Sequence, residues 1–264
     1  MRSEEGSMMS VDVKNREVFG RRDVVRFYAS QDALQGAEAA FLASMTEQLP
    51  TLRMLDVGIG GGRTTAHFAP LAREYVGIDY APEMVEAARR RFAEARFALD
   101  VADARALPYP AERFDMVLFS HCGIDYVPHE ERLSVIREIR RVLTPNGAFC
   151  FSTHNLQRAR SLLHGTSSET LIARMANSLR RRRLRKLNEP IELLGERPHA
   201  MVNDGAFRFG AVTYHIRPSA QVEQLRACGF DDVTVSSART GEPLSRSECA
   251  TTDEPWLSYR CVAA

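Results

Sequence analysis

Hydrophobic residues follow two spacings along the chain, and these alternate most clearly between residues 50 and 155. Short continuous apolar runs, which are typical of buried strands, are followed by segments whose apolar residues recur every three or four positions, as in helices. The strands predicted in this way cover residues 52–56, 75–79, 96–99, 114–120 and 148–153. Strands that alternate with helices predict an α/β domain built around a parallel sheet.

The two ends of the chain extend this pattern. Apolar residues between Val18 and Leu49 recur at helical intervals, so we expect a helical region before the first strand. Residues 1–15 are polar and lack periodicity, which predicts an irregular start. Near the other end, we expect a helix over residues 218–228 and strands over residues 233–235 and 255–262, with the polar residues 238–254 as a loop.

Residues 156–209 interrupt the alternation, because a compact α/β core needs only one helix at this point. We expect this insertion to build a ligand pocket or a subunit contact. The basic run over residues 180–186 lies inside it and is interpreted as a solvated or partner-facing helix. Loose alternation from Phe207 to Ile216 predicts an extra strand that ends the insertion.

A glycine-rich turn follows the first predicted strand. The strand ends in Asp56, and a predicted helix over residues 64–73 follows the turn. Glycines stand at alternate positions between them: Gly58, Gly60 and Gly62. Glycine tolerates positive φ and lets a ligand approach the backbone, and a helix start adds free N–H groups. The dinucleotide fingerprint needs a third glycine where this chain has Arg63, and the acid at Asp56 fits a ligand with positive charge better than a pyrophosphate.

A second acid ends the next predicted strand. Asp79 follows Gly58 by 21 residues, which is the distance that one βαβ unit takes. A carboxylate at this position accepts two hydrogen bonds from a ribose diol better than a neutral side chain does. The alternative is a simple helix N-cap.

These motifs arrive in the order typical of one enzyme family. Asp-Val-Gly-x-Gly-x-Gly resembles motif I of the class I S-adenosylmethionine-dependent methyltransferases. Phe114-Asp115-Met116-Val117 and the connection Arg-Val-Leu-Thr-Pro-Asn-Gly, where Asn146 replaces a glycine, resemble later motifs of the same family. Asparagine tolerates the left-handed conformation, so we expect this turn to be kept.

The resemblance implies a Rossmann-like, doubly wound seven-stranded sheet that is parallel except for its last strand, in the order 3-2-1-4-5-7-6. It also implies a helical lid over residues 1–49 and a methyltransferase core over residues 50–264 that carries the insertion at 156–209. S-adenosylmethionine is the implied cofactor, with the glycines beneath its methionine part, Asp79 on its ribose, Met84 against its adenine and Asp103 on the adenine amine. The full implied set is Tyr28, Asp56, Gly58, Gly60, Gly62, Asp79, Tyr80, Met84, Asp103, Ala104 and Ser120.

Two histidines are candidates for a general base. His121 follows the fourth predicted strand and His154 ends the fifth, and ligands bind outside the carboxyl ends of strands in open parallel sheets. Each histidine could instead be a packing or loop residue. A base is needed only if the acceptor must lose a proton.

Composition limits the partners. The net charge is +1, so no global field favours nucleic acid or an anionic membrane. The five cysteines lack Cys-x-x-Cys pairs, which favours a reducing compartment and disfavours a metal site. No apolar run has the length of a membrane span, so we expect a cytoplasmic protein, as a monomer or homodimer. The single core domain carries its insertion within the chain and shows no appended nucleic-acid module, which favours methylation of a small-molecule acceptor. The alternatives are an RNA methyltransferase that uses the basic run, and a cofactor-binding protein without transfer activity.

Overall fold

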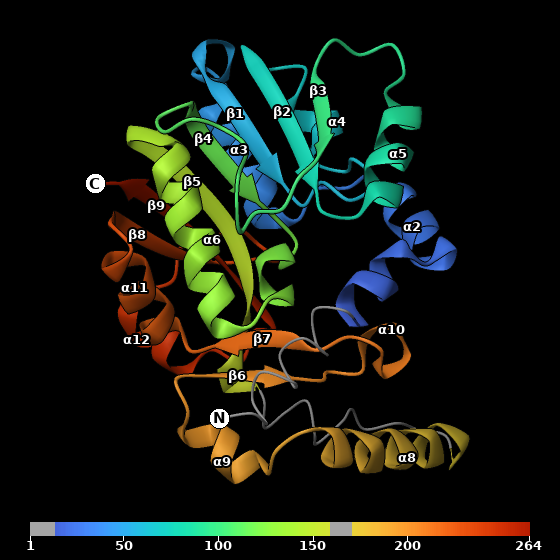
Figure 1. The fold of residues 1–264 in the computed structure, drawn as a ribbon. Helices are drawn as coiled ribbons and strands as arrows, with labels where there is room; N and C mark the ends of the chain where they lie inside the picture. Colours follow the sequence, from blue (N-terminus) through green and yellow to red (C-terminus); the bar gives the residue numbers. More distant parts are fainter. Residues whose placement is uncertain (1–13, 159–170) are drawn as a thin grey trace.

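A nine-stranded sheet forms the centre of the protein in the computed structural model, which describes residues 14–158 and 171–264 (Figure 1). Its strands are β1 (Arg53–Val57), β2 (Glu74–Asp79), β3 (Ala98–Val101), β4 (Phe114–Phe119), β5 (Leu143–Asn155), β6 (His199–Val202), β7 (Thr213–Ile216), β8 (Phe230–Ser237) and β9 (Trp256–Ala263). The sequence patterns located eight of these strands, β7 only in part, and missed β6.

Seven strands form the expected doubly wound core. Strands β3, β2, β1, β4 and β5 are neighbours in that order and parallel; β9 then pairs antiparallel with β5, and β8 antiparallel with β9. Because β8 and β9 are the sixth and seventh strands of the core, the predicted order 3-2-1-4-5-7-6 and the antiparallel last strand are confirmed. Strand β5 begins earlier than predicted and contains Asn146, whose φ of 62° confirms its expected left-handed conformation.

The two remaining strands extend the sheet beyond the end of β4. The pairing of β4 with β5 ends at Phe151, whereas β7 pairs with His154 and Asn155 of the same strand. Strand β9 reaches His154 from the other edge, so β7 occupies the edge of β5 that β4 leaves free. Strand β6 then pairs antiparallel with β7.

The extra strand predicted over residues 207–216 is wrong in its first half. Only Thr213–Ile216 is extended, and the short α10 (Ala206–Phe209) precedes it. Phe207, Arg208 and Phe209 have positive φ, a left-handed conformation that cannot continue a strand.

Helices cover both faces of the sheet (Figure 1). They are α2 (Arg22–Ala29), α3 (Gly36–Met45), α4 (Thr65–Phe68), α5 (Pro82–Arg91), α6 (His129–Val142), α8 (Leu171–Leu187), α9 (Ile191–Glu196), α10, α11 (Pro218–Ala227) and α12 (Arg246–Thr251). Apolar residues of α6 and α11 share one core cluster with strands β1 and β4, and those of α3, α4 and α5 share another. Successive strand residues such as Met54 and Leu55 enter opposite clusters, as the pleat requires.

Two helix predictions need correction. The first crossover helix was expected over residues 64–73, but α4 ends at Phe68 because Pro70 lacks the N–H that another turn requires. The predicted loop over residues 238–254 contains α12, which begins with a capping box between Ser245 and Glu248.

The N-terminal region is helical, as the apolar spacing predicted. Residues 14–20, α2 and α3 precede the first strand, and α2 lies beside α5 (Figure 1). The irregular start expected for residues 1–15 falls almost wholly outside the described residues, as do residues 159–170 of the insertion. None of the helices in the described ranges is long and apolar enough to span a membrane.

Candidate functional site

A cleft opens at the carboxyl ends of β1, β2 and β4. It encloses about 1010 Å³ of empty space, which includes the open solvent at its mouth. Ten of the thirteen site residues predicted from the sequence line this cleft, so the patterns located one common site. The ten are Tyr28, Gly58, Gly60, Asp79, Tyr80, Met84, Asp103, Ala104, Ser120 and His121.

The glycine loop forms the floor of the cleft. Gly58 and Gly60 have φ values of 69° and 53°, which L side chains rarely adopt. The backbone N–H of Gly60 donates to Oδ2 of Asp79 over 2.9 Å. The acid at the end of β2 therefore fixes the loop that follows β1.

Asp79 is the best placed acceptor in the cleft. Its Oδ1 accepts from the N–H of Ala81 at the start of α5 (2.9 Å), so both carboxylate oxygens have a protein donor and keep acceptor capacity for a ligand. Burial raises the pKa of Asp79 to about 6, although the backbone N–H groups oppose this shift. A donor pair from a ligand would favour the charged form further.

Asp56 and Gly62 lie behind the loop and do not line the cleft. Asp56 is fully buried, and its Oδ2 accepts from the Thr64 hydroxyl (2.6 Å) and from the Tyr75 hydroxyl (2.7 Å). Burial raises the pKa of Asp56 to about 7. A Cβ on Gly62 would lie 2.5 Å from the Phe92 ring, so this glycine permits packing. Contrary to the prediction from the sequence, neither Asp56 nor Gly62 therefore lies where it could contact a ligand in the cleft directly. Both residues support the glycine loop from behind.

Gly61, which sequence reasoning passed over, has the closest backbone neighbour in the loop. A Cβ on Gly61 would lie 2.3 Å from the Cα of Ala29 at the end of α2. The N-terminal region therefore packs directly on the glycine loop and carries Tyr28 to the cleft.

Sequence analysis also missed a cation in the cleft. Arg63 lines it and forms an almost buried ion pair with Glu38 of α3, while its Nη2 lies 3.3 Å from the Ser120 hydroxyl. In the sequence, Arg63 only marks the position at which a dinucleotide fingerprint would need a glycine. Its partner is 25 residues away, so no local pattern could have indicated the pair.

The third predicted acid is held by an arginine. Both oxygens of Asp103 accept from the Arg105 guanidinium, at 2.7 to 3.1 Å, and Arg105 also bonds Glu131. Burial alone would raise the pKa of Asp103, but the hydrogen bonds from Arg105 hold it below its ordinary value. Asp103 is thus a charged acceptor on the cleft wall.

Aromatic rings line the remaining wall. Phe19 lies with its centroid 4.6 Å from that of Tyr126 and 5.6 Å from that of Phe207. Tyr28 lies 6.0 Å from Phe19 and 5.8 Å from His121 by the same measure. Phe19 and Tyr126 line the cleft, whereas Phe207 packs against Phe19 and does not line it. None of the three was predicted as a site residue, because each belongs to a different segment and only the tertiary structure brings them together.

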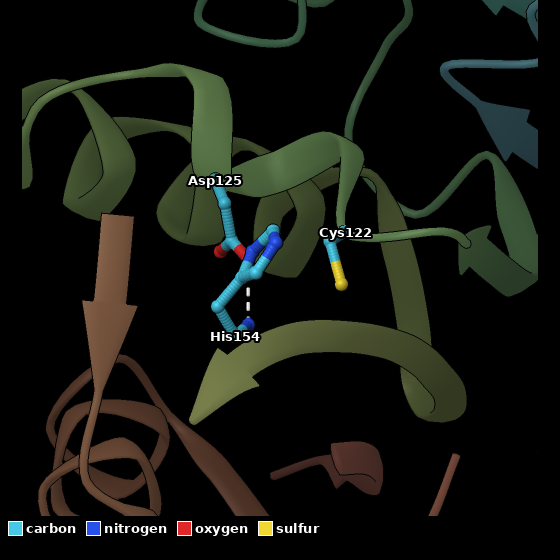
Figure 2. Close-up of side chains that lie close together, drawn as sticks. All are labelled: Cys122, Asp125 and His154. Atoms are coloured by element: carbon cyan, nitrogen blue, oxygen red, sulfur yellow. Dashed lines mark hydrogen bonds and ion pairs between the residues drawn. The ribbon is translucent and has the colours of Figure 1, made fainter. Parts of the chain in front are cut away.

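His154, the second candidate base, does not line the cleft. It lies behind the loop after β4, where Figure 2 shows its ring between the Asp125 carboxylate and the Cys122 thiol. Its Nδ1 lies 2.7 Å from Oδ2 of Asp125, and its backbone N–H donates to the same oxygen over 2.8 Å. Burial opposes its protonation, but Cys122 and Asp125 raise the pKa of His154 well above the ordinary value.

Cys122, Asp125 and His154 offer ligand atoms within 4.8 Å of one another, a spacing that a metal ion could occupy. However, Oδ1 of Asp125 already accepts from Arg132 (2.5 Å) and Thr153 (2.6 Å), and its Oδ2 accepts from His154. A metal ion would have to displace these donors next to the buried guanidinium of Arg132. The three residues therefore fit a hydrogen-bonded support for the loop better than a metal centre.

His121 differs from His154 in its position relative to the cleft and in the direction of its pKa shift. It lines the cleft next to Tyr28 and adopts a left-handed φ of 51°, as does the following Cys122 with 56°. Such strained non-glycine residues persist where the surrounding structure fixes them, often at functional sites. Burial, followed by the charge of Arg63, lowers the pKa of His121 to about 4. His121 is therefore a neutral imidazole at the cleft surface.

The chemistry of the cleft fits S-adenosylmethionine. Gly58 and Gly60 line the cleft with backbone atoms alone, which suits the amino-acid part of the cofactor. The carboxylate of Asp79 retains acceptor capacity for a diol, and the buried Met84 offers an apolar surface. Arg63 supplies a cation for a carboxylate.

Comparisons with known proteins agree with this geometry. A family model described as a methyltransferase domain matches residues 54–147. The uncharacterized methyltransferase YcgJ of Bacillus subtilis is 28% identical over 60% of this chain and 69% of its own length. The ubiquinone biosynthesis O-methyltransferase of Cereibacter sphaeroides is 33% identical, but the match covers 46% of this chain and only 49% of that protein.

Solved structures show the same fold. An S-adenosylmethionine-dependent methyltransferase from Mesorhizobium loti has a TM-score of 0.61 at 20% identity, covering 86% of this chain and 97% of that one. The 1,6-didemethyltoxoflavin-N1-methyltransferase of Burkholderia thailandensis, solved with 1,6-didemethyltoxoflavin and S-adenosylhomocysteine, has a TM-score of 0.59 at 16% identity over 97% of this chain and 89% of its own. At these identities the likeness concerns the fold.

Proposed function

The chain belongs to the class I S-adenosylmethionine-dependent methyltransferases, whose cofactor is S-adenosylmethionine, and we propose that it methylates a small molecule with an apolar or aromatic body. The observation that carries this proposal is the aromatic wall of the cleft. Phe19, Tyr28 and Tyr126 line the space beyond the glycine loop, and Phe207 packs against the Phe19 ring. Such a wall favours a planar or apolar acceptor over a charged one.

We infer the cofactor contacts from the same geometry. Asp79 would accept hydrogen bonds from the ribose hydroxyls, because its oxygens keep acceptor capacity beside the loop. Gly58 and Gly60 would lie beneath the methionine part, where Arg63 would bind the carboxylate. Asp103 would accept from the adenine amine, beside Met84 and Ala104.

The protein's contribution to the chemistry is mainly alignment. When bound, S-adenosylmethionine supplies a methyl group already activated by its sulfonium. The chain must place an acceptor atom in line with that group and exclude water. The aromatic wall contributes to both the alignment and the exclusion of water. For an acceptor that must lose a proton, His121 is the better placed base, because it is neutral and lines the cleft whereas His154 is enclosed.

A transfer assay with S-adenosylmethionine labelled in its methyl group tests the proposal. The acceptor panel would hold phenols, aromatic amines and planar nitrogen heterocycles, with bulk RNA and an unrelated protein as macromolecular comparisons. We expect label to enter one class of aromatic small molecule. Transfer to RNA alone, or no transfer although S-adenosylhomocysteine binds, would overturn the proposed acceptor class.

A variant pair then tests the role of His121 with the acceptor that is found. We expect His121→Asn to lower kcat by about 10²- to 10⁴-fold if the acceptor must lose a proton. The matched control is His67→Asn, a half-buried histidine on α4 that bonds the carbonyl of Asp32 outside the cleft. Unchanged kcat in both variants would remove the base role from His121.

A further inference from the structure

Helix α8 carries a basic and apolar surface that the proposed function does not use. It spans Leu171–Leu187 at one end of the molecule, away from the central sheet (Figure 1). Its sequence contains no acid and seven cations: Arg174, Arg180, Arg181, Arg182, Arg183, Arg185 and Lys186. The chain as a whole is nearly neutral, so this concentration of charge is local.

Exposed apolar side chains accompany the cations. Seven large hydrophobic side chains are strongly exposed among the described residues, and four of them lie on α8 and α9: Met175, Leu179, Leu187 and Leu193. Met175 and Leu179 are 69% and 65% exposed. Single exposed apolar residues are ordinary, but a group on one short segment indicates an interaction surface.

The helix has one face on the protein and one free face. Leu184 is fully buried, Arg183 stacks on the Phe209 ring at 4.5 Å, and Arg180 donates to the carbonyl of Asp204 over 2.7 Å. At 100° per residue, the opposite side presents a stripe with apolar residues in its first half and cations in its second. The stripe consists of Met175, Leu179, Arg182 and Lys186, all of which are exposed.

We propose that this stripe docks the protein on an anionic lipid surface. Helices that lie in a membrane interface combine a Lys- and Arg-rich face with exposed apolar side chains, and each cation near an anionic surface adds to binding. Charge complementarity selects the anionic headgroup, and Met175 and Leu179 supply the part that enters the apolar boundary.

Other occupants match the stripe less well. In a dimer formed through this stripe, two α8 helices that carry cations and no acids would face each other and repel. RNA would use the cations, but α8 offers no aromatic side chain on which bases could stack, and the exposed Met175 and Leu179 would have no partner.

The attachment of α8 connects this surface with the cleft. The segment that holds the helix, residues 203–209, also carries Phe207, which packs against Phe19 of the aromatic wall. A protein docked through α8 would therefore receive an apolar acceptor near the surface in which such molecules concentrate. The docking itself does not depend on the proposed reaction.

Co-sedimentation of the full chain with vesicles tests the proposal. We expect binding to phosphatidylcholine vesicles that contain phosphatidylglycerol, little binding to phosphatidylcholine alone, and loss of binding as salt is raised. Arg182→Gln with Lys186→Gln should weaken binding about 30-fold, because two cations are removed. Met175→Ser with Leu179→Ser should also weaken it measurably at unchanged charge.

The matched control is Arg90→Gln with Arg96→Gln, which removes the same charge from two exposed positions around α5. Circular dichroism and binding of S-adenosylhomocysteine verify that every variant is folded. Equal weakening by the control pair, equal binding to both vesicle types, or binding to an RNA homopolymer or an acidic protein without binding to vesicles would overturn the proposal. These outcomes leave the methyl-transfer result untouched, so the two proposals fail separately.

Discussion

Asp79 and Gly60 are joined by a hydrogen bond of 2.9 Å that connects the end of β2 to the loop after β1. Asp79→Asn should weaken the binding of S-adenosylhomocysteine by about 10- to 100-fold. The carboxylate accepts hydrogen bonds from the backbone N–H groups of Gly60 and Ala81, and the NH₂ group of an amide would face one of these donors. Titration calorimetry measures the change. The control is Glu86→Gln, an exposed acid of α5 that pairs only with Arg90 on the surface. Unchanged affinity in Asp79→Asn would exclude Asp79 as a ligand.

The buried carboxyl of Asp56 predicts a pH dependence of stability. Its pKa in the folded protein is about 7, raised by burial above the ordinary value of 3.8. A raised pKa means that the folded state holds the proton more tightly, so the contribution is fully present below about pH 4 and is lost as the pH rises towards 7. The free energy of unfolding should fall by about 4 kcal/mol at most over this window.

Asp56→Asn tests this assignment. The amide oxygen can still accept from Thr64 and Tyr75, and no proton is exchanged, so denaturant unfolding should show a flatter pH profile than the wild type between about pH 4 and 7. Because Asp56 does not line the cleft, binding of S-adenosylhomocysteine should change by less than about threefold. An unchanged pH profile, or a large loss of affinity, would contradict this placement.

The strands of the sheet could be predicted because parallel strands are buried on both faces and appear as continuous apolar runs. The order of the strands came from the resemblance of their motifs to a family, since no periodicity encodes it. The cleft followed, because the residues at the carboxyl ends of β1, β2 and β4 necessarily meet. Asp79 and Ser120 illustrate this: each directly ends or follows a strand.

The parts that were missed depend on contacts between distant segments. Arg63 meets Glu38 through the packing of α3, and the sequence around neither residue indicates the ion pair. His121 and His154 both follow predicted strands, yet only the path of the loop decides that His121 lines the cleft and His154 lies behind it. In contrast, α12 had a local signal in Ser245 and Glu248 that sequence reasoning overlooked.

Gly61 should be intolerant of even one methyl group. A Cβ would lie 2.3 Å from the Cα of Ala29, and backbone atoms of α2 cannot move aside as a flexible side chain does. Gly61→Ala should destabilise the protein by about 1–3 kcal/mol and weaken cofactor binding, because Tyr28 is displaced with α2. Thermal unfolding and calorimetry measure both effects. Gly20→Ala is the control, since its Cβ would meet only the Glu83 side chain at 3.6 Å and should leave both quantities nearly unchanged.

The pair of Arg132 and Asp125 should be the costliest polar contact to break. Both side chains are fully buried, their atoms lie 2.5 Å apart, and Arg132 also bonds Gln221 over 2.8 Å. Arg132→Met leaves the Asp125 charge without its main partner and should destabilise the protein by about 3–5 kcal/mol. Arg137→Met, on the exposed side of the same helix, should cost less than about 0.5 kcal/mol. Similar losses in the two variants, measured by denaturant unfolding, would contradict the assigned role of the pair.

The pKa values of the two candidate histidines should be shifted in opposite directions. The pKa of His121 is lowered to about 4 by burial and by Arg63, whereas that of His154 is raised well above its ordinary value beside Cys122 and Asp125. Around neutral pH, ¹⁵N NMR of histidine-labelled protein should therefore show His121 as a neutral ring, and the His154 signal should titrate above the ordinary histidine range, with His121→Asn and His154→Asn used to assign the signals. A His121 signal that titrates near pH 6.5 would mean that its ring is hydrated and not held against the cleft wall. A neutral His154 would mean that the Asp125 carboxylate is fully neutralised by Arg132, and the loop after β4 would then be held by hydrogen bonds alone.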